Sequence, residues 1–187
     1  MVQKYVAEIK PLNEAIIGTK PHGTAEFTVS DDALHIEVEM FDTPKNMQHW
    51  EHFHGFTDGK DAQPATMAQD VNHDGVVDLP ETEAVSGTTM VPFDAEPHQM
   101  DIANDTYPVS DDQGHFKYVK HVPLADLKAQ FKKVFGTDDL DLDKRVIYIH
   151  GVPDAVKLPD TVGGNLNEKY DKHVTLPIAV GKIKSVK

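Results

Sequence analysis

Cysteine is missing from the 187 residues of the chain. Its absence excludes disulfide bonds, thiolate metal ligands and a thiol nucleophile, and it means that cysteine usage gives no indication of the redox compartment. The chain also lacks a Gly-Lys-Ser/Thr phosphate loop, a Gly-x-Ser-x-Gly nucleophile elbow and a His-Glu-x-x-His helix. The common forms of nucleotide, serine-hydrolase and zinc-protease chemistry therefore have no support in the sequence.

Basic residues and long apolar runs are also scarce. Lysine and arginine total 18 against 31 aspartates and glutamates, which gives a formal net charge of −13. This charge repels nucleic acid and anionic membrane surfaces and suits a protein that binds cations. No segment is long enough to cross a bilayer, and the first ten residues carry charges where a signal peptide needs apolar residues. We expect no nucleic-acid or membrane partner and a cytoplasmic location, or an extracytoplasmic one if a leader has been removed.

Alternating apolar and polar residues predict an antiparallel sheet. The clearest strand is 33–40, in which every second residue is apolar and the residues between are mostly polar. Further strands are predicted at 2–9, 23–29, 48–55, 116–122, 145–151 and 174–183. Many strands separated by turn residues favour an all-β fold, an antiparallel β-sandwich or barrel that residues 1–187 form as a single domain.

Two segments depart from the strand pattern. Apolar residues recur at helical spacing over 124–135, after Pro123 and before Gly136, so one inserted helix is predicted there. Regular periodicity is lost over 56–115, where Gly, Pro, Asp and Thr dominate, which predicts a long inserted loop. A loop of this length in a compact domain needs a function or something other than a core to order it.

The long loop contains a calcium-binding pattern over 70–81. Calcium takes several hard oxygen ligands around one point, and this spacing wraps a short chain around an ion, with Gly75 at the sharp turn. The predicted ligands are Asp70, Asn72, Asp74, the backbone carbonyl of Val76, Asp78 and Glu81. Because convincing amphipathic helices are not seen on both sides, we expect an isolated structural loop rather than a paired helix–loop–helix sensor.

A second candidate metal site is the pair His52 and His54. Alternate side chains of a strand project from the same face, so the two imidazoles can offer nitrogens to one ion. Neutral imidazole is the commonest metal-donating side chain. Taken alone, the pair is equally compatible with a solvated, histidine-rich surface.

The order of these pieces along the chain resembles the copper/zinc superoxide dismutase family. The matching segments, in chain order, are His52-Phe53-His54 followed by Gly55-Phe56-Thr57-Asp58-Gly59, the long polar loop, Arg145-Val146-Ile147-Tyr148-Ile149-His150, Gly163-Gly164-Asn165 and the closing strand 176–183. The likeness runs from the first strand to the last with gaps. It implies a Greek-key sandwich or barrel in which His52, His54 and His150 bind copper.

The same resemblance implies ligands in the long loop. The segment 98–104 is similar to part of the zinc site of the family, which implies that His98 and Asp101 bind metal, and His49 is a further candidate ligand. The other two loop histidines of the family have no counterpart here unless His73 or His115 substitutes for one of them. The loop disulfide of the family is excluded by the absence of cysteine.

The active-site arginine of the family is also without a counterpart, because its position falls near Thr175. Lys172 and His173 are candidates to stand in for it. A copper site without a guiding arginine is poorly built for fast capture of superoxide.

Three functions remain open. The favoured hypothesis is a metal-binding protein without catalytic activity on this scaffold, with calcium in the long loop and copper or zinc at the histidine cluster. The alternatives are an active copper-dependent superoxide dismutase, which would make the chain an oxidoreductase, and a structural calcium-stabilised β-sandwich without a transition metal. Metal ions are the expected partners, and a homodimer is a further expectation.

Overall fold

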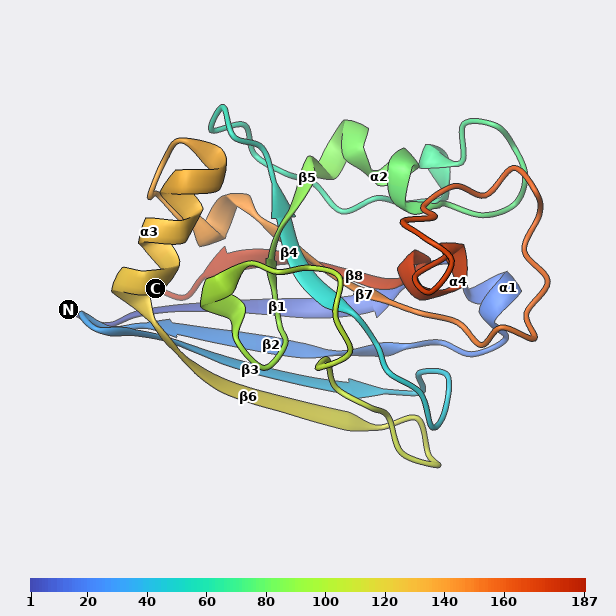
Figure 1. Cartoon of the computed structure of the whole chain (residues 1–187), viewed down its shortest axis with the longest axis horizontal. Coiled ribbons are helices and arrows are strands. Elements are labelled where there is room, and N and C mark those ends of the chain that lie inside the picture. Colours follow the sequence, from blue (N-terminus) through green and yellow to red (C-terminus); the bar gives the residue numbers. More distant parts are fainter.

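Eight antiparallel strands form one curled sheet in the computed structural model, which describes residues 1–187 (Figure 1). The strands are β1 (Gln3–Pro11), β2 (His22–Val29), β3 (Ala33–Phe41), β4 (Glu51–Gly55), β5 (Thr88–Pro92), β6 (Phe116–Pro123), β7 (Val146–His150) and β8 (Pro177–Ser185). Their order across the sheet is β5-β4-β7-β8-β1-β2-β3-β6. The all-β class predicted from the alternating residues is confirmed.

The sheet has two halves that β8 joins, because β8 pairs with β7 along one edge and with β1 along the other. Figure 1 shows β4 and β5 running steeply across the direction of β1, β2, β3 and β6. The chain passes between the halves after β3, after β5 and after β6, so that β4 and β7, which are distant in sequence, become neighbours. In their register His52 lies opposite Tyr148, and Phe53 lies opposite Ile147.

The hydrophobic core lies on the inner face of the curled sheet and contains 29 buried residues. Strand β3 shows how the sequence produces it, because its apolar residues alternate inward while its polar residues remain only partly covered. Phe27, Phe53 and Phe131 are all fully buried there. Each such side chain contributes about 1.5–3 kcal/mol relative to an exposed one.

Strands β4 and β7 are instead buried on both faces. Their outer face is covered by the long connecting segments, which pack against it through a second apolar cluster. This cluster comprises Leu12, Ala62, Ala65, Val77, Val146, Tyr148 and Val180. The histidines of β4 and β7 are therefore enclosed between the sheet and its connections.

Four helices complete the fold, and none of them is both long and apolar enough to cross a membrane. They are α1 (Glu14–Ile17), α2 (Leu79–Ser86), α3 (Leu124–Phe135) and α4 (Lys172–Thr175), with short 3-10 turns η1 (Met67–Gln69), η2 (Pro97–Gln99) and η3 (Leu142–Lys144). The predicted helix over 124–135 is confirmed as α3, which ends at Gly136 in the left-handed conformation. Figure 1 shows α3 at the end of the sheet where both termini lie.

The prediction of an irregular loop over 56–115 with only one helix in the whole chain is wrong, because α2 and β5 both form within that segment. The side chains that α2 buries completely are those of Thr82 and Ser86, so the helix has no apolar stripe. Its start is fixed instead by a capping box between Asp78 and Glu81. Strand β5 buries adjacent residues at its end, including Val91, and so lacks the alternation that marks a strand in sequence.

Candidate metal centre

Three histidines converge on the outer face of β4 and β7. His52 and His54 alternate along β4, and His150 is the last residue of β7, where the register between β7 and β8 shifts. One ring nitrogen from each lies within 4.8 Å of the others. The exposed fractions of the three residues are 2%, 1% and 1%, so the cluster is shielded from solvent. The structure therefore brings together the three histidines that the sequence singled out, and they could hold a metal ion.

The hydrogen bonds around two of these rings assign their tautomers. The Nδ1–H of His150 donates to the carbonyl oxygen of Thr175 at 2.8 Å, because a carbonyl can only accept. The hydroxyl of Tyr107 donates to the carbonyl of Ile102 at 2.7 Å and therefore accepts from the Nε2–H of His52 at 3.0 Å. The lone pairs of His150 Nε2 and His52 Nδ1 are left free, as metal ligation requires.

The free nitrogens have no partner in the protein. His52 Nδ1, His150 Nε2 and both ring nitrogens of His54 are buried and make no hydrogen bond. Each buried polar group without a partner costs about 1–3 kcal/mol. Such groups are rare in folded proteins, and a bound ion is one of the reasons for them. The three imidazoles thus fit the donor set of a transition metal such as copper or zinc.

The electrostatics of the cluster favour the neutral form of all three imidazoles. Burial, and then the neighbouring histidines, lower the pKa of His52 and of His54 well below the ordinary value. Burial also lowers the pKa of His150 to about 4. All three rings are therefore neutral near pH 7, and each keeps one lone pair for an ion.

Aromatic rings pack around the cluster and restrict its side chains. Tyr148 lies against His54 with ring centroids 4.7 Å apart, and Trp50 stacks on Tyr107 at 5.3 Å. The hydroxyl of Tyr148 also accepts a hydrogen bond from the backbone N–H of Ala65, which fixes the covering segment over the site. Tyr148 alternates with His150 along β7, but nothing in the sequence marks it as part of the site, and no spacing pattern relates Tyr107 to the histidines.

The other three predicted transition-metal ligands lie outside this cluster. Both ring nitrogens of His49 are 2.9 Å from backbone carbonyl oxygens, those of His150 and Pro44, so this ring braces the end of β7. His98 lies in η2 and Asp101 follows it, and neither belongs to a set of three converging donor atoms. Metal binding by His49, His98 and Asp101 stays a prediction.

The two residues that could replace an active-site arginine are engaged elsewhere. The ammonium group of Lys172 donates to the carbonyl oxygen of Pro159 at 3.0 Å. The ring nitrogens of His173 lie 3.3 Å from a carboxylate oxygen of Asp171 and 2.8 Å from the carbonyl oxygen of Val156. Neither side chain offers a free cation to the histidine cluster.

The predicted calcium loop folds around its acidic residues. Carboxylate oxygens of Asp70, Asp74 and Glu81 lie within 4.8 Å of one another. Asp78 caps α2 by accepting a hydrogen bond from the backbone N–H of Glu81 at 3.0 Å, so the last three residues of the loop form the start of α2. Only the short turn η1 precedes the loop. The loop therefore leads into a helix, α2, but has no α-helix directly before it.

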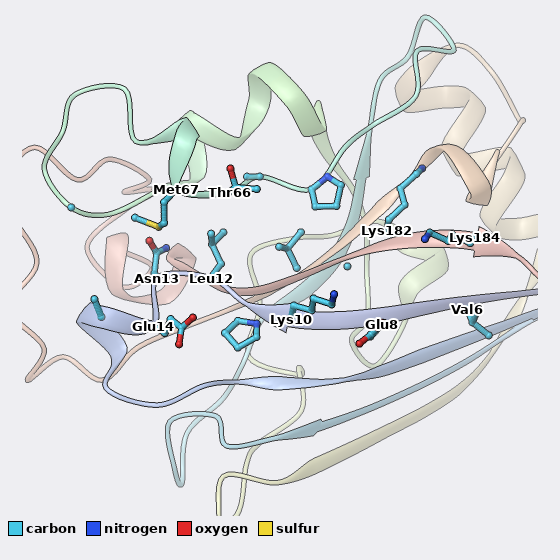
Figure 2. Close-up of a pocket in the computed structure, with 17 residues that line it drawn as sticks. Val6, Glu8, Lys10, Leu12, Asn13, Glu14, Thr66, Met67, Lys182 and Lys184 are labelled. Atoms are coloured by element: carbon cyan, nitrogen blue, oxygen red, sulfur yellow. The ribbon is translucent and has the colours of Figure 1, made fainter.

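A separate pocket of about 660 Å³ lies on the outer face of β1 and β8, beside residues 64–67 (Figure 2). Figure 2 shows Glu8 and Lys10 on the sheet side of this pocket and Met67 on the opposite side. None of the three clustered histidines lines it. The histidine cluster is therefore an enclosed site rather than part of this pocket.

Comparison with known proteins assigns no family to the chain. A scan against protein-family models finds no match, and a search of curated proteins finds no significant relative. The likeness to the superoxide dismutase family rests on the residues and their order alone.

Proposed function

We propose that the chain is a metal-binding protein that holds one copper or zinc ion through His52, His54 and His150. The observation that carries the proposal is the set of buried ring nitrogens that converge without hydrogen-bond partners. Copper and zinc both accept imidazole, and zinc is held by three histidines in known catalytic sites. The scaffold is proposed to be superoxide dismutase-like, which the pairing of β4 with β7 supports.

The proposed role is to hold the ion rather than to turn over superoxide. The exposed fraction of each histidine is 2% or less, which leaves little room for an approaching anion. By the proposed resemblance the arginine of the dismutase family falls near Thr175, an uncharged residue whose hydroxyl donates to the carbonyl of Gly164. The formal net charge of −13 opposes the approach of an anion as well.

A second ion is proposed for the loop 70–81, where calcium would order the connection. Two observations support it: the oxygen-donor spacing of the sequence and the convergence of three carboxylates on one point. An ion there would bind only the folded loop and would stabilise the fold by mass action.

Titration of the chelator-treated chain with copper(II) or zinc(II) tests the histidine site. We expect saturation at one ion per chain, with tight binding lost in His52→Ala and in His150→Ala. The matched control is His121→Ala, which removes an exposed histidine from the outer face of β6 and should leave binding unchanged. Unchanged metal content in the two cluster variants would refute the site. Superoxide decay by the copper-loaded chain above the metal-free background would establish the dismutase alternative.

A further inference from the structure

A chain of hydrogen bonds connects the loop 70–81 to the residues beside α4. The hydroxyl of Thr161 donates to a carboxylate oxygen of Asp74 at 2.7 Å. The backbone N–H of Gly163 donates to a carboxylate oxygen of Asp78 at 2.6 Å. Both acceptors belong to the predicted calcium ligands, and both donors belong to the segment that leads into α4. Figure 1 shows this segment passing beside the connection that precedes α2.

The same segment contacts the histidine cluster through Thr175. The hydroxyl of Thr175 donates to the carbonyl oxygen of Gly164 at 2.8 Å. The backbone carbonyl of Thr175 accepts the Nδ1–H of His150, also at 2.8 Å. Thr175 is 1% exposed, so both bonds are shielded from bulk solvent. One residue therefore holds both the turn at Gly163–Gly164 and the ring of a candidate metal ligand.

The turn fits closely between its neighbours. Gly164 has a φ of +100°, and a Cβ atom on it would lie 2.5 Å from the Thr175 hydroxyl oxygen. A Cβ atom on Gly163 would lie 3.2 Å from the ring of Pro80, in the first turn of α2. Displacement of α2 or of the loop before it would therefore push the turn against Thr175. Close packing of this kind transmits small shifts between neighbouring elements.

We infer that Thr175 is a positioning residue for the metal ligand His150, and that the loop 70–81 acts on the histidine cluster through the turn Gly163–Gly164. The carbonyl of Thr175 fixes the tautomer and the rotation of the His150 ring, so that Nε2 points at the site of the ion. The hydroxyl of the same residue fixes that carbonyl by holding Thr175 against the turn. This inference rests on the proposed function of the cluster.

An ion in the loop and an ion at the histidines are consequently coupled. A carboxylate oxygen has two lone pairs, so Asp74 can bind an ion and still accept the hydrogen bond of Thr161. Calcium in the loop would hold the carboxylate of Asp74, which converges with those of Asp70 and Glu81, and with it the segment that leads through the turn to Thr175. Coupling of binding free energies is reciprocal, so copper at the histidines would tighten calcium binding by the same factor.

The positioning role is tested by a matched pair of variants of the full chain. Thr175→Val removes the hydroxyl and keeps the shape of the side chain, whereas Thr175→Ser keeps the hydroxyl. We expect the copper(II) affinity to fall about tenfold in Thr175→Val, the lower end of the effect of outer-shell changes, and to recover in Thr175→Ser. The electron paramagnetic resonance spectrum of bound copper should change in the valine variant only. Wild-type affinity and spectrum in Thr175→Val would overturn the inference.

The coupling is tested by copper(II) titration in calcium-free buffer and in saturating calcium. We expect calcium to raise the copper affinity of the wild-type chain about fivefold or more. Thr161→Val changes an exposed residue, and it should reduce this factor while both ions still bind. The coupling can therefore still be tested with this variant if Thr175→Val fails to fold. Equal copper affinity with and without calcium would refute the coupling alone. Absence of copper binding in both buffers would refute the proposed function, and the inference with it.

Discussion

Replacement of His54 by leucine should stabilise the metal-free protein and at the same time abolish its transition-metal binding. His54 is the member of the cluster whose two ring nitrogens are both buried without a partner. A neutral imidazole carries one N–H donor and one lone pair, and each is deprived of water at this position. Leucine has a similar volume and no polar atom to desolvate.

The size of the effect follows from these two groups. Each unsatisfied group costs about 1–3 kcal/mol, and imperfect packing of the new side chain offsets part of the gain, so we expect a net increase of about 2 kcal/mol in the free energy of unfolding. For a chain of this length, that corresponds to a rise of about 4–8 °C in Tm. Urea unfolding in the presence of a chelator measures the first quantity, and thermal unfolding measures the second.

His150→Leu is the matched control, because it empties the same site but breaks a hydrogen bond. Without the His150 ring, the buried carbonyl of Thr175 has no hydrogen-bond donor. His150→Leu should therefore be less stable than His54→Leu by about 1–3 kcal/mol. Copper or zinc should stabilise the wild-type chain and neither variant. Loss of stability in His54→Leu in the presence of chelator, or stabilisation of this variant by metal equal to that of the wild type, would refute the cost assigned to the buried nitrogens of His54.

Three further outcomes are expected. Burial places the pKa of His150 at about 4, below its value in the unfolded chain, so the unfolded state binds more protons between about pH 4 and 6.5. The free energy of unfolding should therefore fall on acidification by up to about 1.4 kcal/mol per pH unit for this residue. In a pH series of urea melts, the free energy of unfolding of His150→Leu should depend less steeply on pH. Calcium at a hundred times its Kd should add about 2.7 kcal/mol of stability in thermal melts, and Asp70→Asn combined with Glu81→Gln should remove that gain; no effect of calcium on the wild type would count against the loop site. Asn13→Ala should lower the free energy of unfolding in urea melts by about 2–4 kcal/mol, since the Asn13 side chain donates to the carbonyls of Val77 and Pro177 and accepts from the N–H of Val77. A loss below about 0.5 kcal/mol would show that these hydrogen bonds are unimportant for stability.

The sequence predicts those parts of the fold in which one face of a strand or helix meets water. Strand β3 and helix α3 are predictable because their apolar residues repeat with the period of the element. Helix α2 has no such repeat, because the side chains that it buries completely, those of Thr82 and Ser86, are polar. Strand β5 is buried at adjacent positions and therefore carries no alternation.

The candidate site was predictable in its donors but not in their surroundings. The alternation of His52 and His54 indicates a shared face, and the resemblance to the dismutase family supplied His150. The partners that orient these rings could not be read from spacing, because one is the hydroxyl of Tyr107 and the other is a backbone carbonyl, that of Thr175. Long connections bring both to the sheet, and their final positions depend on tertiary packing.

The proposed metal centre holds one transition-metal ion between three histidines. Anomalous diffraction at the copper absorption edge, from crystals of the copper-loaded protein, would locate that ion. The expected result is a single peak in each chain within bonding distance of a ring nitrogen of His52, His54 and His150. A map of the fully loaded protein without a peak at these rings, or with its peak at other residues, would contradict the claim.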